Sequence, residues 1–289
     1  MSKIETVSIL ASGFEYVFET ALHETGFCVL KDVFDPKFSL FEEAYKQAAD
    51  FFSENDFAKN LFVPVSHKTG YFDYKQEHAK GNKHPDLKEF FHFYIDAGPK
   101  ELPFENAGPF YGIFGSMESL ARHLLQVLAV ANETQAFNCY SHEQSLLRVL
   151  HYPPLKRAKT KCLRAAEHED INLITLLPVS TAPGLQVKLR DGTWEDVEAK
   201  PGEVIVNVGD MLQNLSNGFY TSATHRVVNP DGEDAKRSRY SMPFFAHATP
   251  ETDLSPLEHK FDLVGDKRFP SITARDYLQQ RLAEIGLKK

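Results

Sequence analysis

The chain has 289 residues, of which 42% are hydrophobic and 12% aromatic, so it can bury a full core and form one large domain or two smaller ones. Its formal net charge of -8 argues against nucleic acid or an anionic membrane as a partner. Three widely spaced cysteines without a CxxC pair argue against a disulfide framework or a zinc knuckle. There is no signal-peptide pattern and no apolar run as long as a membrane span, so we expect a soluble cytoplasmic protein.

The front half of the chain is predicted to be mainly helical. Apolar residues recur at helical spacing over residues 38–58 and 114–131, which predicts two supporting helices. Residues 66–96, between them, are rich in Gly, Lys, His and aromatics, which predicts a long loop that leads into a short strand at 90–95. The front half is therefore predicted to be a helical region that supports the rest of the protein.

The rear half changes to short runs of β-favouring residues separated by turn signals. The candidate strands are residues 146–152, 172–177, 185–189, 204–208, 224–228 and 239–245. Turns are signalled by Asp191-Gly192, Pro201-Gly202 and Pro230-Asp231-Gly232. Many short antiparallel strands without a βαβ rhythm predict a barrel or jelly roll. A last helix at 274–285 is expected to pack across the outside.

The triplet His168-Glu169-Asp170 carries the first chemical signal. On a strand, His168 and Asp170 would point to one face and Glu169 to the other, and His225 lies on a separate predicted strand. Two imidazoles and one carboxylate leave three positions open on an octahedral ferrous ion, which is the ligand set of non-haem Fe(II) oxygenases. The similar His84-Pro85-Asp86 is rejected as a metal site because it lies in a predicted loop.

A second signal is Arg239-Tyr240-Ser241. Arg239 and Ser241 share one strand face, and a guanidinium beside a hydroxyl is a good receptor for a buried carboxylate. On the earlier strand Tyr152 could reach the same carboxylate with its hydroxyl. These residues predict that a carboxylate binds near the metal, but they do not show whether it belongs to a co-substrate or to the substrate.

Short motifs in a fixed order then carry a family resemblance. In the rear half they are residues 168–177 (HEDINLITLL), 184–187 (GLQV), 206–210 (VNVGD), 215–218 (LSNG), 225–227 (HRV) and 239–241 (RYS). In the front half they are residues 25–27 (TGF), 70–71 (GY), Glu77, 86–89 (DLKE) and 151–154 (HYPP). Together they cover nearly the whole chain and resemble the isopenicillin N synthase-like family of 2-oxoglutarate/Fe(II)-dependent dioxygenases.

The resemblance implies an α+β fold, in which a double-stranded β-helix (jelly roll) core is flanked by N-terminal and C-terminal helices. We expect a helical N-terminal region at 1–140, the core at 141–250 and a C-terminal helical segment at 251–289, packed as one unit. It also implies Fe(II) bound by His168, Asp170 and His225. A co-substrate carboxylate is then held by Arg239 and Ser241, with Tyr152 touching it.

The implied activity is oxidation of a small organic substrate by O2. With 2-oxoglutarate as co-substrate, the enzyme would hydroxylate, desaturate or cyclise that substrate and release succinate and CO2. The residues around Glu169 are closer to isopenicillin N synthase itself, a four-electron oxidase that uses no 2-oxoglutarate, so this alternative stays open. A catalytically inactive binding protein is a more remote alternative.

Substrate contacts are predicted from strand alternation alone. Asn172, Phe245 and His247 are expected to face inward, and Tyr71 is expected to contact the substrate as part of a lid in the front loop. A basic run at 156–164 is either a solvated edge or a field that attracts an anionic co-substrate. Substrate identity and oligomeric state do not follow from the sequence.

Overall fold

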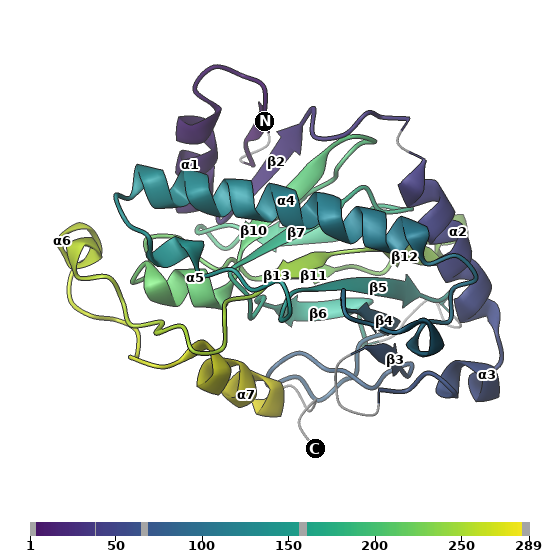
Figure 1. The fold of residues 1–289 in the computed structure, drawn as a ribbon. Helices are drawn as coiled ribbons and strands as arrows, with labels where there is room; N and C mark the ends of the chain where they lie inside the picture. Colours follow the sequence, from purple (N-terminus) through teal and green to yellow (C-terminus); the bar gives the residue numbers. More distant parts are fainter. Residues whose placement is uncertain (1–3, 38, 65–68, 156–160, 285–289) are drawn as a thin grey trace.

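A computed structural model of the chain describes residues 4–37, 39–64, 69–155 and 161–284 (Figure 1). The helices are α1 (Phe14–Glu24), α2 (Leu40–Ser53), α3 (Asp56–Asn60), α4 (Gly108–Ala131), α5 (Asp210–Leu215), α6 (Phe261–Val264) and α7 (Ala274–Glu284). None of the helices in these ranges has the length and apolar character that a membrane span requires.

Within the described ranges the strands form two sheets, as expected for a jelly roll with helices outside it. The large sheet contains β1 (Thr6–Ser8), β2 (Phe27–Lys31), β10 (Val204–Val208), β7 (Ile174–Pro178), β13 (Phe244–Ala246), β5 (Leu146–Tyr152), β4 (Glu89–Phe93) and β3 (Gly70–Phe72) in spatial order, with β12 (Arg239–Ser241) also paired to β5. The small sheet contains β6 (Ala165–His168), β11 (His225–Val227), β8 (Leu185–Lys188) and β9 (Trp194–Asp196).

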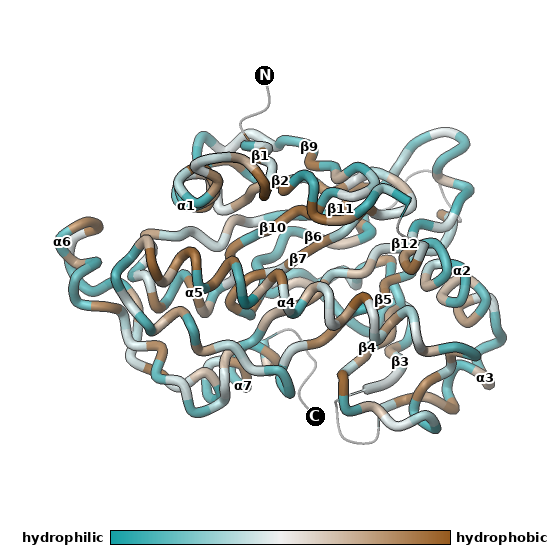
Figure 2. Tube along the Cα trace, turned by 45° about the horizontal axis from the view of Figure 1, so that its top comes forward, coloured by the Kyte–Doolittle hydropathy of each residue, from teal (hydrophilic) through white to brown (hydrophobic). Residues whose placement is uncertain are grey.

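Helix α4 packs lengthwise on one face of the large sheet (Figure 1). It alternates between hydrophobic and hydrophilic residues along its length in Figure 2, as an amphipathic helix with one buried face should. Strand β5 divides its side chains accordingly. Leu147 and Val149 join the core beneath α4, whereas Arg148 and Tyr152 line a cavity on the other face. The large sheet therefore separates an apolar core from the functional side.

Most predicted elements are confirmed, with shifted boundaries. β5 and β10 have the predicted bounds, whereas α4 begins six residues before the predicted start at Phe114. The helix predicted over 38–58 is broken, because Glu54 has extended backbone angles and the Asn55 side chain caps the start of α3. The strand predicted over 239–245 is divided into β12 and β13, since Pro243 has no N–H to donate to a neighbouring strand.

The front half contributes more strand than its sequence suggested. β1 and β2, which were not predicted, pair with each other, and β2 pairs with β10. Residues 70–72, predicted to be loop, form β3 and pair with β4. β4 then pairs with β5, so strands from both halves of the chain build one sheet.

Candidate active site

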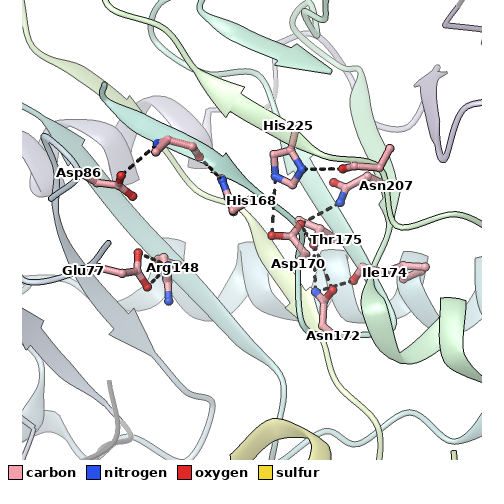
Figure 3. A network of polar contacts seen from close by, with 12 residues as sticks. Glu77, Asp86, Arg148, His168, Asp170, Asn172, Ile174, Thr175, Asn207 and His225 are labelled. Atoms are coloured by element: carbon pink, nitrogen blue, oxygen red, sulfur yellow. Dashed lines mark hydrogen bonds and ion pairs between the residues drawn. The ribbon is translucent and has the colours of Figure 1, made fainter. Parts of the chain in front are cut away.

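Three predicted ligands converge at one end of the small sheet. One ligand atom each from His168, Asp170 and His225 lie within 4.8 Å of one another. The His225 Nε2 and Asp170 Oδ1 atoms are 3.7 Å apart, and the two imidazole centroids are 4.3 Å apart. Figure 3 shows the three side chains turned toward a common point. This is the only such group of three or more His, Cys, Asp or Glu residues in the described ranges.

Backbone pairing explains why the histidines meet. His168 ends β6 and lies directly opposite His225, the first residue of β11. Asp170 was predicted to lie on the same strand as His168, and this is wrong: β6 stops at His168 and Asp170 belongs to the following turn. The turn is fixed because the N–H of Asp210, at the start of α5, donates to the Asp170 carbonyl at 2.7 Å.

Each ligand is oriented by a second contact. The Nδ1 atoms of His168 and His225 lie 2.7 Å and 3.1 Å from the carbonyl oxygens of Ala166 and Ala223. A carbonyl can only accept, so both rings carry hydrogen on Nδ1 and leave Nε2 free to bind a metal.

The Asp170 carboxylate is oriented by hydrogen bonds from two neighbouring strands. Thr175 of β7 donates its hydroxyl to Oδ2 at 2.6 Å, and Asn207 of β10 donates its amide to the same oxygen at 2.8 Å (Figure 3). Thr175 and Asn207 are direct cross-strand partners, so their side chains lie on the same face. The other carboxylate oxygen, Oδ1, faces the histidines.

The electrostatics favour the protonation states that a metal needs. Burial, and then the neighbouring His225, lowers the pKa of His168 to about 4, so the ring is neutral at physiological pH. Burial alone would raise the pKa of Asp170, but His225, His168 and the two hydrogen bonds outweigh it and lower that pKa. Two imidazoles and a carboxylate on one side of a cavity fit a ferrous ion with open positions.

The predicted carboxylate receptor lies in the same cavity, whose volume is about 560 Å³. Arg239 and Tyr152 are direct partners across β12 and β5, and the Arg239 Cζ atom is 5.0 Å from the Tyr152 ring centroid. The Arg239 guanidinium donates to the Ser241 hydroxyl at 3.2 Å, to the Ser180 hydroxyl at 3.1 Å and to the Ala182 carbonyl at 2.8 Å. Arg239 is only 2% exposed, yet all of these partners are neutral.

The predicted substrate residues have different locations. Phe245 and His247 line the cavity, on the same face of the strand region around β13. Asn172 borders it, but its amide donates to the Thr175 hydroxyl at 2.9 Å and to the Ile174 carbonyl, so it supports the metal site. Tyr71 does not reach the cavity. It is 1% exposed in the core and its hydroxyl donates to Glu89, so the predicted lid contact is not present.

The sequence interpretation gave no role to a charged cluster on the cavity wall. Lys88 contacts Glu77 at 2.6 Å and Asp86 at 2.8 Å. Arg148 contacts Glu77 at 3.3 Å (Figure 3). Strand alternation places Arg148 on the same face as Tyr152, and this was the one feature of the sequence that pointed to Arg148 as a cavity residue. The partners come from a loop with no periodicity, so their convergence could not be anticipated.

Helix α7 does more than pack across the outside. Its residues Leu278, Arg281 and Leu282 line the cavity, and Arg281 pairs with the Asp210 carboxylate at 2.8 Å. Of the basic run at 156–164, residues 156–160 lie outside the described residues. Arg164 is 1% exposed and donates to the Arg237 carbonyl, so it is no part of a solvated edge.

Two family models match the chain. The model of the 2OG-Fe(II) oxygenase superfamily matches residues 142–248, which include all three metal-site residues and Arg239. The model described as the N-terminal region of a non-haem dioxygenase in morphine synthesis matches residues 17–110.

Similar proteins agree with these models. A candidate 2OG-Fe(II) oxygenase family protein of known structure from Caulobacter crescentus is 32% identical with a TM-score of 0.81, and the match covers 98% of this chain and 99% of that one. A candidate oxygenase from Shewanella oneidensis is 35% identical with a TM-score of 0.76, covering 99% and 100%. A rice (Oryza sativa subsp. japonica) protein named 2-oxoglutarate-dependent dioxygenase 11 is 33% identical over 168 residues, 56% of this chain and 45% of the rice protein. The matches thus span less than half the length of the first curated relatives. The chain belongs to the 2OG-Fe(II) oxygenase superfamily.

Proposed function

We propose that this protein is an Fe(II)- and 2-oxoglutarate-dependent oxygenase that hydroxylates, desaturates or cyclises a small organic substrate and releases succinate and CO2. The observation that carries the proposal is the Arg239 guanidinium, which is buried in the same cavity as the metal site without a described anionic partner. A buried charge is costly unless it is paired, so this site is suited to a carboxylate that arrives with a ligand.

Each group of residues has a defined task. His168, Asp170 and His225 would hold the iron, which with 2-oxoglutarate and O2 supplies the oxidising chemistry. Arg239 and Ser241 would bind the far carboxylate of 2-oxoglutarate, and Tyr152 limits the space beside the guanidinium. The name of the rice relative, a 2-oxoglutarate-dependent dioxygenase, supports this choice of co-substrate.

The remaining task is to keep water away from the reaction. Leu278 and Leu282 of α7 close one side of the cavity with apolar surface, and Leu150 and Leu185 line it from the two sheets. A cavity with these walls holds the substrate near the metal and limits unproductive oxidation. A cytoplasmic location is part of the same proposal, because the sequence has only three cysteines, which are widely spaced and form no CxxC pair.

Oxygen consumption tests the proposal. A metabolite extract that contains the substrate should stimulate O2 uptake by the Fe(II)-loaded protein only when 2-oxoglutarate is present, with one succinate formed for each oxidised substrate. Oxygen uptake without 2-oxoglutarate would instead support the four-electron oxidase alternative. Absence of both metal binding and turnover would support a binding protein.

The carboxylate receptor can be tested separately. Arg239→Met should abolish 2-oxoglutarate binding while the protein still binds Fe(II), because Arg239 is not a metal ligand. Arg122→Met, on the exposed side of α4, is a matched control and should bind 2-oxoglutarate like the wild type. Unchanged 2-oxoglutarate affinity in Arg239→Met would remove the main support for this co-substrate.

A further inference from the structure

Three neighbouring strands place a polar patch on the cavity wall. His92 of β4 and Arg148 of β5 are direct cross-strand partners, and His247 follows β13, which pairs with β5. All three residues line the cavity that contains the metal ligands. The patch therefore faces the space in which a substrate would lie.

The charged side chains in this part of the cavity wall already form ion pairs with one another. Glu77 pairs with both Lys88 and Arg148, and Asp86 pairs with Lys88. Burial alone would raise the pKa of Glu77, but Arg148 and Lys88 lower it well below its ordinary value; burial alone would lower the pKa of Lys88, but Glu77 and Asp86 raise it. Two carboxylates face two cations, so a charged substrate would find no complementary charge left over here.

The hydrogen-bond geometry fixes the state of His92. The Nε of Arg148 lies 2.8 Å from His92 Nε2, and a guanidinium can only donate. His92 Nε2 is therefore an acceptor, and the ring is neutral with its hydrogen on Nδ1. This fits the pKa of His92, which burial and then Arg148 hold well below its ordinary value.

His92 and His247 each have a buried Nδ1 without a hydrogen-bond partner among the described residues, but the His92 ring is held by Arg148 at Nε2. His247 is 7% exposed, and its imidazole makes no hydrogen bond to any residue in the described ranges. Burial lowers the pKa of His247 to about 4, so the ring is neutral and offers one donor and one acceptor. A buried polar group without a partner is costly, and native structures rarely keep one unless a ligand or water satisfies it.

Aromatic rings surround the patch. The Arg148 Cζ atom lies 4.3 Å from the Phe90 ring centroid and 5.3 Å from that of Phe245, so rings border the guanidinium. Phe72 and Leu146 also line the cavity. The cavity wall beside Arg148 therefore offers ring and aliphatic surface that suits a flat, hydrophobic body.

We propose that the substrate is an uncharged molecule with a flat apolar body and a carbonyl, amide or hydroxyl group, and that His247 anchors this polar group by a hydrogen bond. This substrate class rests on the proposed function, since it assumes that the cavity is an oxygenase active site. His247 acts as a specificity-determining residue and the ion pairs of Arg148 and Glu77 exclude competing charged compounds.

Three probes with the same ring and different charge test the proposal: benzamide, benzoate and benzylamine. Their affinities would be measured by calorimetry or ligand-observed NMR on the full chain with Mn(II) and saturating 2-oxoglutarate, so that the carboxylate receptor at Arg239 is already occupied and does not bind benzoate. Benzamide should bind about tenfold more tightly than either charged probe. His247→Phe, which keeps a ring but removes the hydrogen bond, should weaken benzamide about tenfold, equal to about 1.4 kcal/mol.

His142→Phe, at an exposed histidine outside the cavity, is the matched control and should leave benzamide affinity unchanged. The inference is overturned if no probe binds, if benzoate or benzylamine binds as well as benzamide, or if His247→Phe keeps the wild-type affinity. Thermal melting of His247→Phe shows whether the variant is folded.

A separate measurement distinguishes this failure from failure of the proposed function. Anaerobic addition of Fe(II) and 2-oxoglutarate should produce a weak visible charge-transfer band in both the wild type and His247→Phe. A band without preference for benzamide would refute only the substrate class. No band in the wild type would refute the proposed function, whatever the probes show.

Discussion

The hydroxyl of Thr175 should control how well Asp170 binds a metal. In the structure it donates to Asp170 Oδ2 at 2.6 Å, and the Asn207 amide is the other side-chain donor to that oxygen. Thr175→Val keeps the shape of the side chain and removes this hydrogen bond together with the one that the Asn172 amide donates to the Thr175 hydroxyl. We expect the carboxylate to lose its fixed orientation, because one donor leaves it free to rotate about the remaining contact.

The magnitude follows from the charge of the acceptor. A hydrogen bond to an ionised, buried group contributes about 1.5–3 kcal/mol, so metal affinity should fall by about 10- to 100-fold. The metal-free variant should also unfold more easily, because Asp170 remains buried with fewer partners. Competition with a chromogenic chelator measures the affinity, and urea unfolding measures the stability.

Thr175→Ser is the matched control, since it retains the hydroxyl and should bind metal nearly as tightly as the wild type. The reasoning is refuted if Thr175→Val binds Fe(II), or a redox-inert substitute such as Zn(II), with wild-type affinity. Equal losses in the Val and Ser variants would also refute it, because the Ser variant keeps the hydroxyl and its hydrogen bond to Asp170.

Three further predictions concern the cavity walls. Phe245→Ala should reduce substrate turnover severalfold without changing metal affinity, because the ring lines the cavity; equal loss of both would show a structural role. Glu77→Gln should lower the free energy of unfolding by about 3 kcal/mol at pH 7, because Lys88 and Arg148 lose a buried partner. In urea titrations, the difference in unfolding free energy between the wild type and Glu77→Gln should stay constant down to the ordinary carboxyl pKa of 4.5 and become smaller below it. The reason is that the pKa of Glu77 is lowered in the folded protein, so the stabilisation is lost as the pH falls through that lowered value. A difference that does not depend on pH would contradict the ionised, paired state of Glu77. Arg281→Met should raise the KM for substrate more than the KM for 2-oxoglutarate, because α7 closes the cavity through Asp210; equal effects in steady-state kinetics would count against this.

The sequence predicted which of the site residues lie together because most of the relevant signals are local. His168, His225, Arg239 and Ser241 lie on short strands, where alternation determines which face a side chain occupies. Asp170 lies beside the two histidines as expected, but it does not share a strand with His168. It lies in a turn held by the N–H of Asp210, a contact between segments that no local pattern connects.

The errors have physical causes. Tyr71 looked like a loop residue because the strand that contains it is only three residues long, too short for its alternation to be recognised. β1 and β2 were missed since helix signals dominate the front half and β10, the other partner of β2, lies far along the chain. The Lys88, Glu77 and Asp86 cluster depends on loop geometry, which hydrophobic periodicity does not encode.

The contact between Asp210 and Arg281 connects the last helix to the metal site. The Asp210 backbone holds the Asp170 turn, and its side chain holds α7. A displacement of α7 therefore either breaks the ion pair or pulls on the backbone next to a metal ligand. A spectroscopic probe at the metal site, such as the EPR spectrum of bound Mn(II), would consequently detect movement of α7 without a label on the helix.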